Sequence, residues 1–355
     1  MKRLLSMLIS MVLVCLSACS STNVASVNAS ELNIVQESTK QNDLVASKTL
    51  ETKETNSLMS SKGINGDKPI VYFTNDITAD SLVKIYEKLN WTPTGNVGVK
   101  ISTGEPPRSN YLRVDLIGDL IKKVNGTIIE CNTAYGGQRA STELHKQVAK
   151  DHGYTDIANV DIMDEEGDMN IPVANGEKID HAIVGSHMPN YNSILVLSHF
   201  KGHQMAGFGG AIKNVGIGMS SSKGKVWVHS GGKSTTDGLF GTPQNEWLPA
   251  LAEMVKGVSD YYDNGKRMTY INVMNRLSID CDCNGNPAEP DIHDIGILAS
   301  NDPVALDQAC IDLIYKADGN QSFINRVNQQ QGLITLEHAE KIGLGTREYE
   351  LVDID

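Results

Sequence analysis

The stretch SILVLSHFKGHQMAGFGGAIKN, residues 193–214, joins a short apolar run to a segment rich in glycine, histidine and lysine. The run 193–198 has the length and the Ile, Leu and Val content of a buried strand. In open α/β sheets, ligands collect outside the carboxyl ends of such strands. The stretch therefore predicts a buried strand with a binding loop at its carboxyl end.

Five further apolar runs predict the remaining strands, at 69–73, 96–101, 126–132, 269–274 and 294–299. Between the strands, apolar residues recurring every three or four positions predict helices over 79–89, 112–124, 141–153, 245–262 and 302–317. Alternating strands and helices favour an α/β fold in which a mainly parallel sheet is covered by helices on both faces. We expect a single α/β domain over residues 67–355.

Polar segments follow several of these strands directly. They read TNDIT, STGEPPR, NTAYGGQR and SNDP after the strands that begin near residues 69, 96, 126 and 294. Because the carboxyl ends of parallel strands meet at one edge of a sheet, these segments predict one shared site at that edge.

Residues 199–214 supply the candidate catalytic residues, which are His199, Lys201, His203 and Lys213. Histidine can carry a proton or bind a metal near neutral pH, and lysine can hold an anion. Candidate ligand-binding residues in the same segment are Gly209, Gly210 and Asn214, since glycine lets backbone amides approach a ligand. Neither G-x-x-x-x-G-K-[ST] nor G-x-G-x-x-G occurs here, and the alternative is a flexible glycine loop with two surface histidines.

A second candidate segment, residues 134–153, places four further candidate ligand-binding residues before a helix: Tyr135, Gly136, Gly137 and Arg139. The planar guanidinium of Arg139 suits a carboxylate or phosphate. We interpret His145 and His152 as solvated helix residues. The loop 226–238, with His229 and Lys233, either joins the site or is a mobile connection.

Residues 280–283 read DCDC and are the candidate metal ligands Asp280, Cys281, Asp282 and Cys283. In an extended chain, the two carboxylates would share one face and the two thiols the other. Thiolates bind soft metals and carboxylates hard ones, but neither pair completes a coordination shell alone. Four cysteines, Cys131, Cys281, Cys283 and Cys310, could hold a cluster or form disulfides, although the helical spacing of Cys310 favours the core.

The first 19 residues combine Lys2 and Arg3 with a short apolar run and the sequence LSAC, which resembles a lipobox. This pattern predicts a lipoprotein signal peptide over 1–19 and lipidation of Cys19. The polar segment 20–66, without proline or aromatic residues, predicts a disordered spacer. We therefore expect a protein of the cell envelope, held by lipid on the extracytoplasmic side of a bacterial membrane.

The formal net charge is −12, and Lys and Arg do not cluster. Nucleic-acid binding needs a surplus of these residues on one face, so no nucleic-acid partner is expected.

The segments NTAYGGQR, LSHFKGHQMAGFGGAIKN, KVWVHSGGK and the DCDC region resemble the bacterial and archaeal family called domain of unknown function 362, over roughly residues 67–355. The resemblance implies an uncharacterised iron–sulfur-centre protein. Many members carry a ferredoxin-like insertion with C-x-x-C-x-x-C clusters, but the corresponding interval here, 225–278, has no cysteine. A ferredoxin-type iron–sulfur cluster is therefore not supported by the residues.

Together, these features predict an extracytoplasmic protein that binds a metal ion beside an anionic small molecule. Redox or metal-assisted acid/base chemistry is the expected reaction class. The alternative is a non-catalytic metal- or ligand-binding lipoprotein.

Overall fold

The computed structural model describes residues 68–355. The expected signal peptide, the spacer and Cys19 lie outside these residues. None of the helices within 68–355 is long and apolar enough to cross a membrane.

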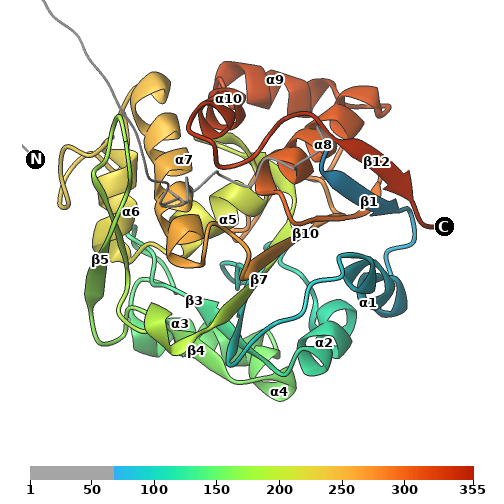
Figure 1. The fold of residues 1–355 in the computed structure, drawn as a ribbon, viewed down its shortest axis with the longest axis horizontal. Coiled ribbons are helices and arrows are strands. Elements are labelled where there is room, and N and C mark those ends of the chain that lie inside the picture. The colour runs from blue at the N-terminus through green and yellow to red at the C-terminus, as the bar shows by residue number, and fades with distance from the viewer. Residues whose placement is uncertain (1–67) are drawn as a thin grey trace, which may run out of the picture. The chain divides into compact units, whose positions relative to one another are not determined.

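An eight-stranded sheet runs through the described part of the chain, in the order β12-β1-β11-β10-β7-β2-β3-β4 (Figure 1). Its strands are β1 (Ile70–Thr74), β2 (Val97–Lys100), β3 (Gly126–Glu130), β4 (Val160–Ile162), β7 (Ser193–His199), β10 (Met268–Met274), β11 (Gly296–Ser300) and β12 (Glu350–Asp353). β11 is antiparallel to both of its neighbours, whereas every other neighbouring pair is parallel. The predicted mainly parallel sheet is therefore confirmed.

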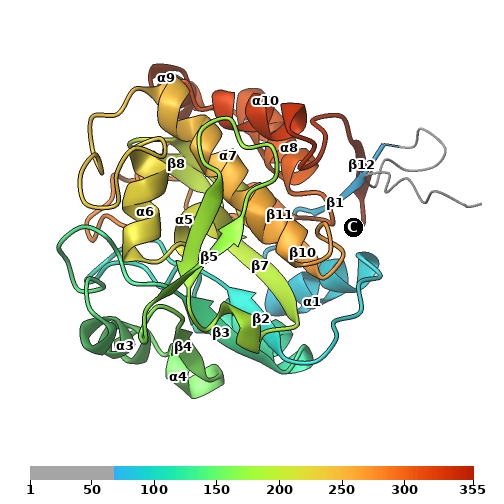
Figure 2. The ribbon, with the colours of Figure 1, turned by 60° about the vertical axis from the view of Figure 1, so that its left-hand side comes forward.

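Two small antiparallel hairpins accompany the sheet. One pairs β5 (Asp168–Pro172) with β6 (His181–Gly185), and the other pairs β8 (Lys201–His203) with β9 (Gly207–Gly209). Figure 2 shows the first hairpin beside α6 and α7.

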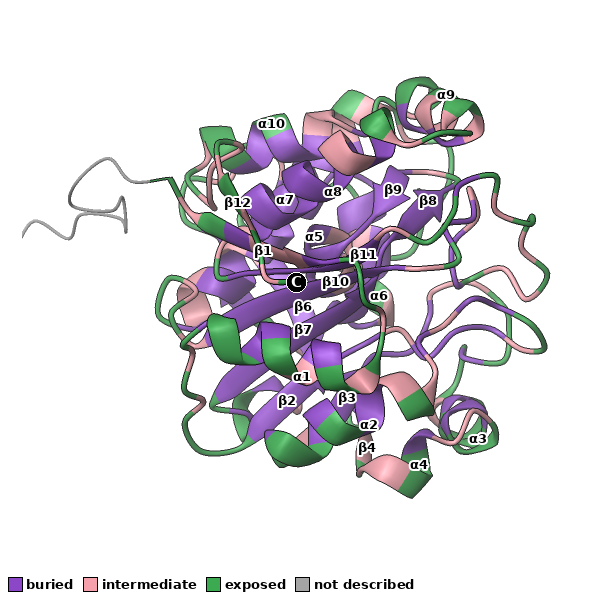
Figure 3. Cartoon of the chain, turned by 90° about the vertical axis from the view of Figure 1, so that its right-hand side faces the viewer, coloured by how far each residue is buried: buried purple, intermediate pink, exposed green. Residues whose placement is uncertain are grey.

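Helices cover both faces of the sheet, as Figure 3 shows edge-on. One face carries α1 (Ala79–Lys88), α2 (Val114–Lys123) and α4 (Tyr154–Ile157), with α3 (Thr142–Asp151) beside α4. The other carries α5 (Ala211–Gly218), α6 (Ser222–His229), α7 (Gln244–Tyr261), α8 (Pro303–Lys316), α9 (Gln321–Gln329) and α10 (Ile334–Lys341). A short 3-10 helix, η1 (Met188–Asn190), precedes β7.

The central strand β7 shows why both faces are covered. Ile194 and Val196 belong to the core under α5 and α7, whereas Leu195 and Leu197 belong to the core under α1 and α2. Successive side chains of a strand point to opposite faces, so this apolar run can be buried only between two layers.

The prediction that all of the polar segments meet at one edge of the sheet is wrong for the segment after β11. Because β11 runs against its neighbours, its carboxyl end lies at the opposite edge of the sheet. The SNDP segment there serves a helix: Asp302 accepts hydrogen bonds from the backbone N–H groups of Val304 and Ala305 at the start of α8. The TNDIT segment after β1 likewise begins α1, where the Asp76 carboxylate accepts from the Thr78 and Ser81 hydroxyls.

Candidate functional site

A cavity of about 320 Å³ opens among the segments that follow β2, β3, β7 and β10. Its wall contains the side chains of five cationic residues: Lys100, Arg139, Lys201, Lys213 and Lys225. Two carboxylates, Glu130 and Asp282, also line it. Cations therefore outnumber carboxylates in this wall, although the whole chain has a formal net charge of −12.

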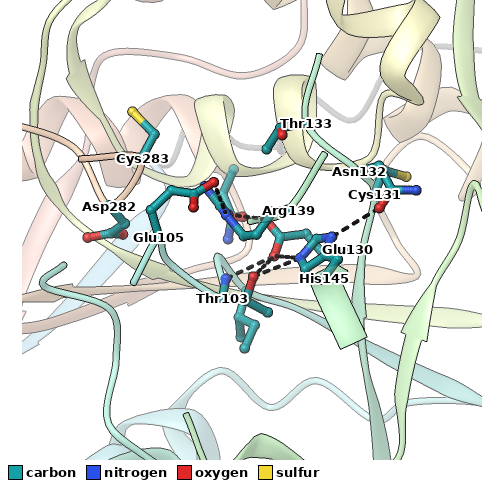
Figure 4. Close-up of polar contacts among 12 residues, drawn as sticks. Thr103, Glu105, Glu130, Cys131, Asn132, Thr133, Arg139, His145, Asp282 and Cys283 are labelled. Atoms are coloured by element: carbon teal, nitrogen blue, oxygen red, sulfur yellow. Dashed lines mark hydrogen bonds and ion pairs between the residues drawn. The ribbon is translucent and has the colours of Figure 1, made fainter. Parts of the chain in front are cut away.

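Arg139 is neutralised by protein carboxylates. Its Nε lies 3.3 Å from Oε1 of Glu105 and its Nη1 lies 3.3 Å from Oε1 of Glu130. Its Nη2 donates to the Tyr135 hydroxyl at 2.9 Å. Figure 4 shows this buried network. Arg139, which was predicted to bind an anionic ligand, is thus already paired with two carboxylates of the protein. Its role in this structure is to hold Glu105, Glu130 and Tyr135 in place beside the cavity.

Glu130, the last residue of β3, gathers polar groups from three other segments. Its Oε2 accepts from the backbone N–H and the hydroxyl of Thr103 at 2.9 and 2.6 Å, and lies 3.2 Å from Nε2 of His145. Burial raises the pKa of Glu130, but Lys100, His145 and Arg139 outweigh it, so its pKa is lowered well below the usual value. The interpretation of His145 as a solvated helix residue is wrong, because its side chain is fully buried against Glu130.

His152 also differs from the expectation of a solvated side chain. It is half-buried, stacks on Tyr111 with ring centroids 3.9 Å apart, and places Nδ1 2.8 Å from the carbonyl oxygen of Thr103. It therefore supports the segment after β2.

Lys100, which was not predicted from the sequence, ends β2 inside the cavity. Its ammonium group donates to Oδ1 of Asn214 at 2.9 Å and to the carbonyl oxygen of Ile101. Burial lowers the pKa of Lys100 to about 8. A Cβ at Gly218 would lie 2.2 Å from Nζ of Lys100, so a larger residue there would force this ammonium group to move. A lysine inside an apolar strand, NVGVKI, was the available signal.

The predicted ligand-binding residue Asn214 lines the cavity, but its side-chain amide is used internally. Nδ2 donates to the carbonyl oxygens of Lys100 and Leu197 and to the Ser198 hydroxyl, at 3.0, 3.2 and 3.0 Å. Asn214 therefore joins the carboxyl ends of β2 and β7.

Lys213 has no hydrogen-bond or ion-pair partner within residues 68–355. Burial and the charge of Lys201 lower its pKa to about 7. Its side chain passes Gly209, where a Cβ would lie 3.0 Å from Cδ of Lys213 and 3.7 Å from Cε of Lys201. Gly209 lines the cavity and lets the side chain of Lys213 pass close to its backbone.

Lys225, also not predicted, lies on α6, whose last four residues, 226–229, were expected to belong to a loop. Its ammonium group donates to the carbonyl oxygen of Ser220 at 2.6 Å, and burial lowers its pKa. His229 from the same helix lines the cavity and stacks on Trp247, whereas Lys233 forms an ion pair with Glu246 away from the cavity.

The remaining predicted glycines have separate roles. Gly210 lines the cavity, and a Cβ there would lie 2.3 Å from Oδ1 of Asp307, which accepts from the N–H groups at the start of α5. Gly136 and Gly137 do not line the cavity, although Tyr135 does. Gly137 is close to the Glu105 carboxylate instead.

The DCDC segment follows β10 and forms a turn, so the expected division of thiols and carboxylates onto two strand faces is wrong. Cys281 and Cys283 are joined by a disulfide, and both line the cavity. Asp280 points elsewhere and accepts from the backbone N–H of Ala288 at 3.0 Å. It is absent from the cavity wall, unlike the three residues that follow it.

Asp282 is buried between two cations. Its Oδ1 lies 2.8 Å from Nδ1 of His199, and its Oδ2 lies 2.9 Å from Nζ of Lys201. These charges outweigh burial and hold the pKa of Asp282 well below its usual value. The Nε2 of His199 faces the carbonyl oxygen of Asn275 at 2.7 Å, so both ring nitrogens face acceptors, which the cationic ring satisfies with two donors. His199 lies outside the cavity wall and orients Asp282.

A ring nitrogen of His203 and the two sulfur atoms of Cys281 and Cys283 lie within 4.8 Å of one another. The Nδ1 of His203 accepts from the backbone N–H groups of Met205 and Ala206, at 3.1 and 2.9 Å, which leaves the ring hydrogen on Nε2. Burial, together with Lys213, His229 and Lys201, holds the pKa of His203 well below its usual value. His203 is therefore a neutral side chain of the cavity.

The other two cysteines of the expected set of four are buried free thiols. Cys131 donates to the carbonyl oxygen of Met219, and burial raises its pKa to about 12. Cys310 packs in the core on α8, as its helical spacing indicates.

No curated protein matches this chain at a significant level. Among solved structures, the lactate racemase apoprotein from Thermoanaerobacterium thermosaccharolyticum is similar, with a TM-score of 0.41 and 14% identity over 68% of this chain and 56% of that one. A protein from Thermotoga maritima gives a TM-score of 0.38 and 10% identity over 74% of this chain and 58% of its own. This chain thus spans less than two thirds of either structure.

One protein-family model matches this chain. The model of one family matches residues 97–312, a range that runs from the start of β2 into α8 and contains every cavity-lining residue. The chain therefore belongs to the family described as domain of unknown function DUF362.

Proposed function

We propose that this protein binds a small organic anion, carrying a carboxylate, sulfonate or phosphate group, in the cavity at the carboxyl ends of β2, β3, β7 and β10. The observation that carries the proposal is the excess of cationic side chains in the cavity wall of an acidic protein. Lys213 is the group available to the anion, because no described residue neutralises it.

The apolar residues that line the cavity support an organic anion over an inorganic one. Met205, Ile217, Leu239 and Phe240 line it, and Phe240 is 67% exposed on the loop after α6. A cavity of about 320 Å³ with a few convergent polar groups is within the range of small-molecule sites.

Calorimetric titration with succinate, 2-mercaptoethanesulfonate and phosphate tests the proposal. We expect saturable binding of at least one of them, and Lys213→Met should weaken it by roughly tenfold or more, because a charge-assisted contact contributes about 1.5–3 kcal/mol. The matched control is Lys150→Met on the exposed side of α3, which should bind like the unmodified chain. Equal weakening by both variants, or no binding by the unmodified chain, would contradict the proposal.

Metal binding is a second candidate function, favoured by the proximity of His203, Cys281 and Cys283. The oxidised site does not fit a metal, because the disulfide offers no thiolate and Nδ1 of His203 is used as an acceptor. Reduction would free two thiolates, a donor pair for a single soft ion rather than a four-cysteine cluster. Stoichiometric zinc in the reduced chain, absent from Cys281→Ser/Cys283→Ser, would support this function, and equal zinc contents would exclude it.

We also propose that lipid on Cys19 holds the protein on the extracytoplasmic side of a bacterial membrane, within the cell envelope. The support is the lipobox-like LSAC sequence after a short apolar run. Cys19→Ala should shift the protein from the membrane fraction to the soluble fraction after cell disruption, and unchanged fractionation would reject the anchor.

A further inference from the structure

We propose that the Cys281–Cys283 disulfide is a reversible redox group that exchanges with small anionic thiols held in the cationic cavity. This inference rests on the proposed anion binding and names the ligand class: a thiol that also carries a carboxylate, sulfonate or phosphate.

The position of the disulfide supports exchange with a small molecule. Both of its cysteines line the cavity that Lys201 and Lys213 also line. Cys281 is 4% exposed, and Cys283 is the more exposed of the two. A thiolate entering the cavity therefore reaches the sulfur of Cys283 first, and Cys281 is the leaving group.

The surroundings of the sulfurs stabilise the thiolate that departs. Thiolates form more readily near cationic groups, and Lys201 and Lys213 line the same cavity as the two cysteines. The neutral ring of His203, with a nitrogen within 4.8 Å of each sulfur, adds a polar neighbour. Asp280 and Asp282 both adjoin Cys281 in the sequence. His199 and Lys201 balance the charge of Asp282, and Asp280 lies 3.6 Å from Nη1 of Arg326.

The exchange takes two steps. In the first, the thiolate RS⁻ attacks the Cys283 sulfur, an R–S–S–Cys283 bond forms, the Cys281–Cys283 bond breaks, and the Cys281 thiolate takes up a proton. In the second, another RS⁻ attacks the sulfur of R, releasing RSSR and the Cys283 thiolate, which is also protonated. Two RSH are oxidised to RSSR, their two protons end on the cysteines, and the protein disulfide is reduced.

The segment that carries the disulfide is fixed to two neighbouring parts of the site. The backbone N–H of Glu105 donates to the carbonyl oxygen of Asp282 at 2.7 Å, and the N–H of Gly202 donates to that of Ser278 at 2.8 Å. One bond holds the segment before the cysteines and the other holds the residue between them, so we expect the thiols to stay in the cavity wall when the disulfide opens.

The test compares three thiols on the purified full-length chain: anionic 2-mercaptoethanesulfonate, neutral 2-mercaptoethanol and cationic cysteamine, each at the same thiolate concentration. Iodoacetamide traps free thiols at timed intervals, and mass spectrometry of the peptide containing Cys281 and Cys283 gives the rate of reduction. We expect the anionic thiol to react at least about tenfold faster than the neutral one, as electrostatic focusing in a cationic cleft allows, and the cationic thiol to be slowest.

Two controls make the comparison specific. Lys213→Met should bring the anionic and neutral rates within about twofold of each other, whereas Lys150→Met should preserve the preference. In the unmodified chain, succinate in excess should slow the anionic thiol and leave the neutral one unchanged, which tests the cavity without any substitution.

Equal rates for the three thiols, or a faster cationic thiol, would overturn the inference. If succinate still binds calorimetrically in that case, the anion-binding function stands and only the redox inference falls. If neither binding nor a rate preference is found, both fail.

Discussion

Asp282 connects the two chemical features of the cavity, because it stands between the disulfide cysteines in sequence and between two cations in space. Its carboxylate meets His199 on one oxygen and Lys201 on the other. Since all three side chains are buried, each charge depends on the others for compensation. The residue therefore holds the DCDC turn against the carboxyl end of β7.

Asp282→Asn should lower the free energy of unfolding by about 3–5 kcal/mol, because the amide keeps the shape of the side chain but leaves two buried cations without a counter-charge. Denaturant titration followed by circular dichroism measures the change. The control Asp237→Asn, in the exposed loop after α6, should alter stability by less than about 0.5 kcal/mol. A loss as small as that of the control would mean that Asp282 is not paired in solution.

Lys213 gives the cavity a pH dependence whose direction can be stated. Burial lowers its pKa to about 7, so its cationic form, which attracts an anion, is populated below that pH and lost above it. With 2-mercaptoethanesulfonate, whose sulfonate stays ionised, affinity should fall roughly tenfold as pH rises from 6 to about 8.5. Calorimetry at each pH gives the affinity, and Lys213→Met should show a smaller dependence. An affinity that rises with pH would show that the cationic form of Lys213 does not bind the anion.

At the scale of elements, the site depends on a close approach between β8 and the segment before the DCDC turn. A Cβ at Gly202 would lie 2.5 Å from both the Cα and the carbonyl oxygen of Ile279. No side chain fits at this distance without moving one backbone away from the other. The glycine in KGH is therefore required by packing.

Gly202→Ala should destabilise the fold by about 1–3 kcal/mol, the usual cost of overpacking, and should also weaken anion binding by displacing Lys201 from the DCDC turn. Denaturant titration and calorimetry measure the two effects. Gly136→Ala is the matched control, because no atom lies within 4 Å of the place that its new methyl group would take and its backbone is not left-handed. Equal stability and equal anion affinity of the two variants would show that β8 and the segment at Ile279 are not closely packed in solution.

Elements with a strong apolar pattern could be predicted from the sequence, short strands such as β2 and β11 included, and elements with a weak pattern could not. β7 and β10 are mostly apolar, and α7 repeats its apolar residues over 18 positions, so their patterns are strong. α5 is different, because Gly216 and Gly218 have a low helix propensity and the sequence does not predict a helix there. A Cβ at Gly216 would lie 2.5 Å from Leu251 of α7, so the helix packs closely against α7. This contact joins residues far apart in the sequence, so it cannot be predicted from the local sequence. The hairpins β5–β6 and β8–β9 were not predicted for the same reason.

At the scale of the whole molecule, charge is distributed unevenly. The chain as a whole is strongly acidic, yet the cavity wall collects five cations from β2, β3, β7 and their following segments. A sequence shows total charge but not this separation, which arises because parallel strands bring their carboxyl ends together. His199, Lys201 and Lys213 were predicted at the site from their loop, whereas Lys100 and Lys225 lie within a strand and a helix and gave weaker signals.

A ligand in this cavity should stabilise the whole described domain, because it contacts segments from most of the sheet. At a concentration 100 times the dissociation constant, an anion that binds only the folded chain raises the free energy of unfolding by about 2.7 kcal/mol. Thermal unfolding with and without 2-mercaptoethanesulfonate measures this gain. With a tenfold weaker affinity, Lys213→Met should show only about half of this gain, about 1.4 kcal/mol, at the same concentration. An equal gain would place the anion elsewhere.

The reversed direction of β11 has a further consequence for how this site can change. The chain leaves β10 and enters β11 at the same edge of the sheet, and the backbone N–H of Ile295 donates to the carbonyl oxygen of Met274 at 2.9 Å, closing the intervening segment at its base. Doubling the length of a closed loop costs only about 0.6 kcal/mol of chain entropy. Residues 275–294 can therefore be lengthened, shortened or exchanged without shifting the register of either strand. A change in the chemistry of this segment, thiols included, would therefore leave the order of the strands in the sheet intact.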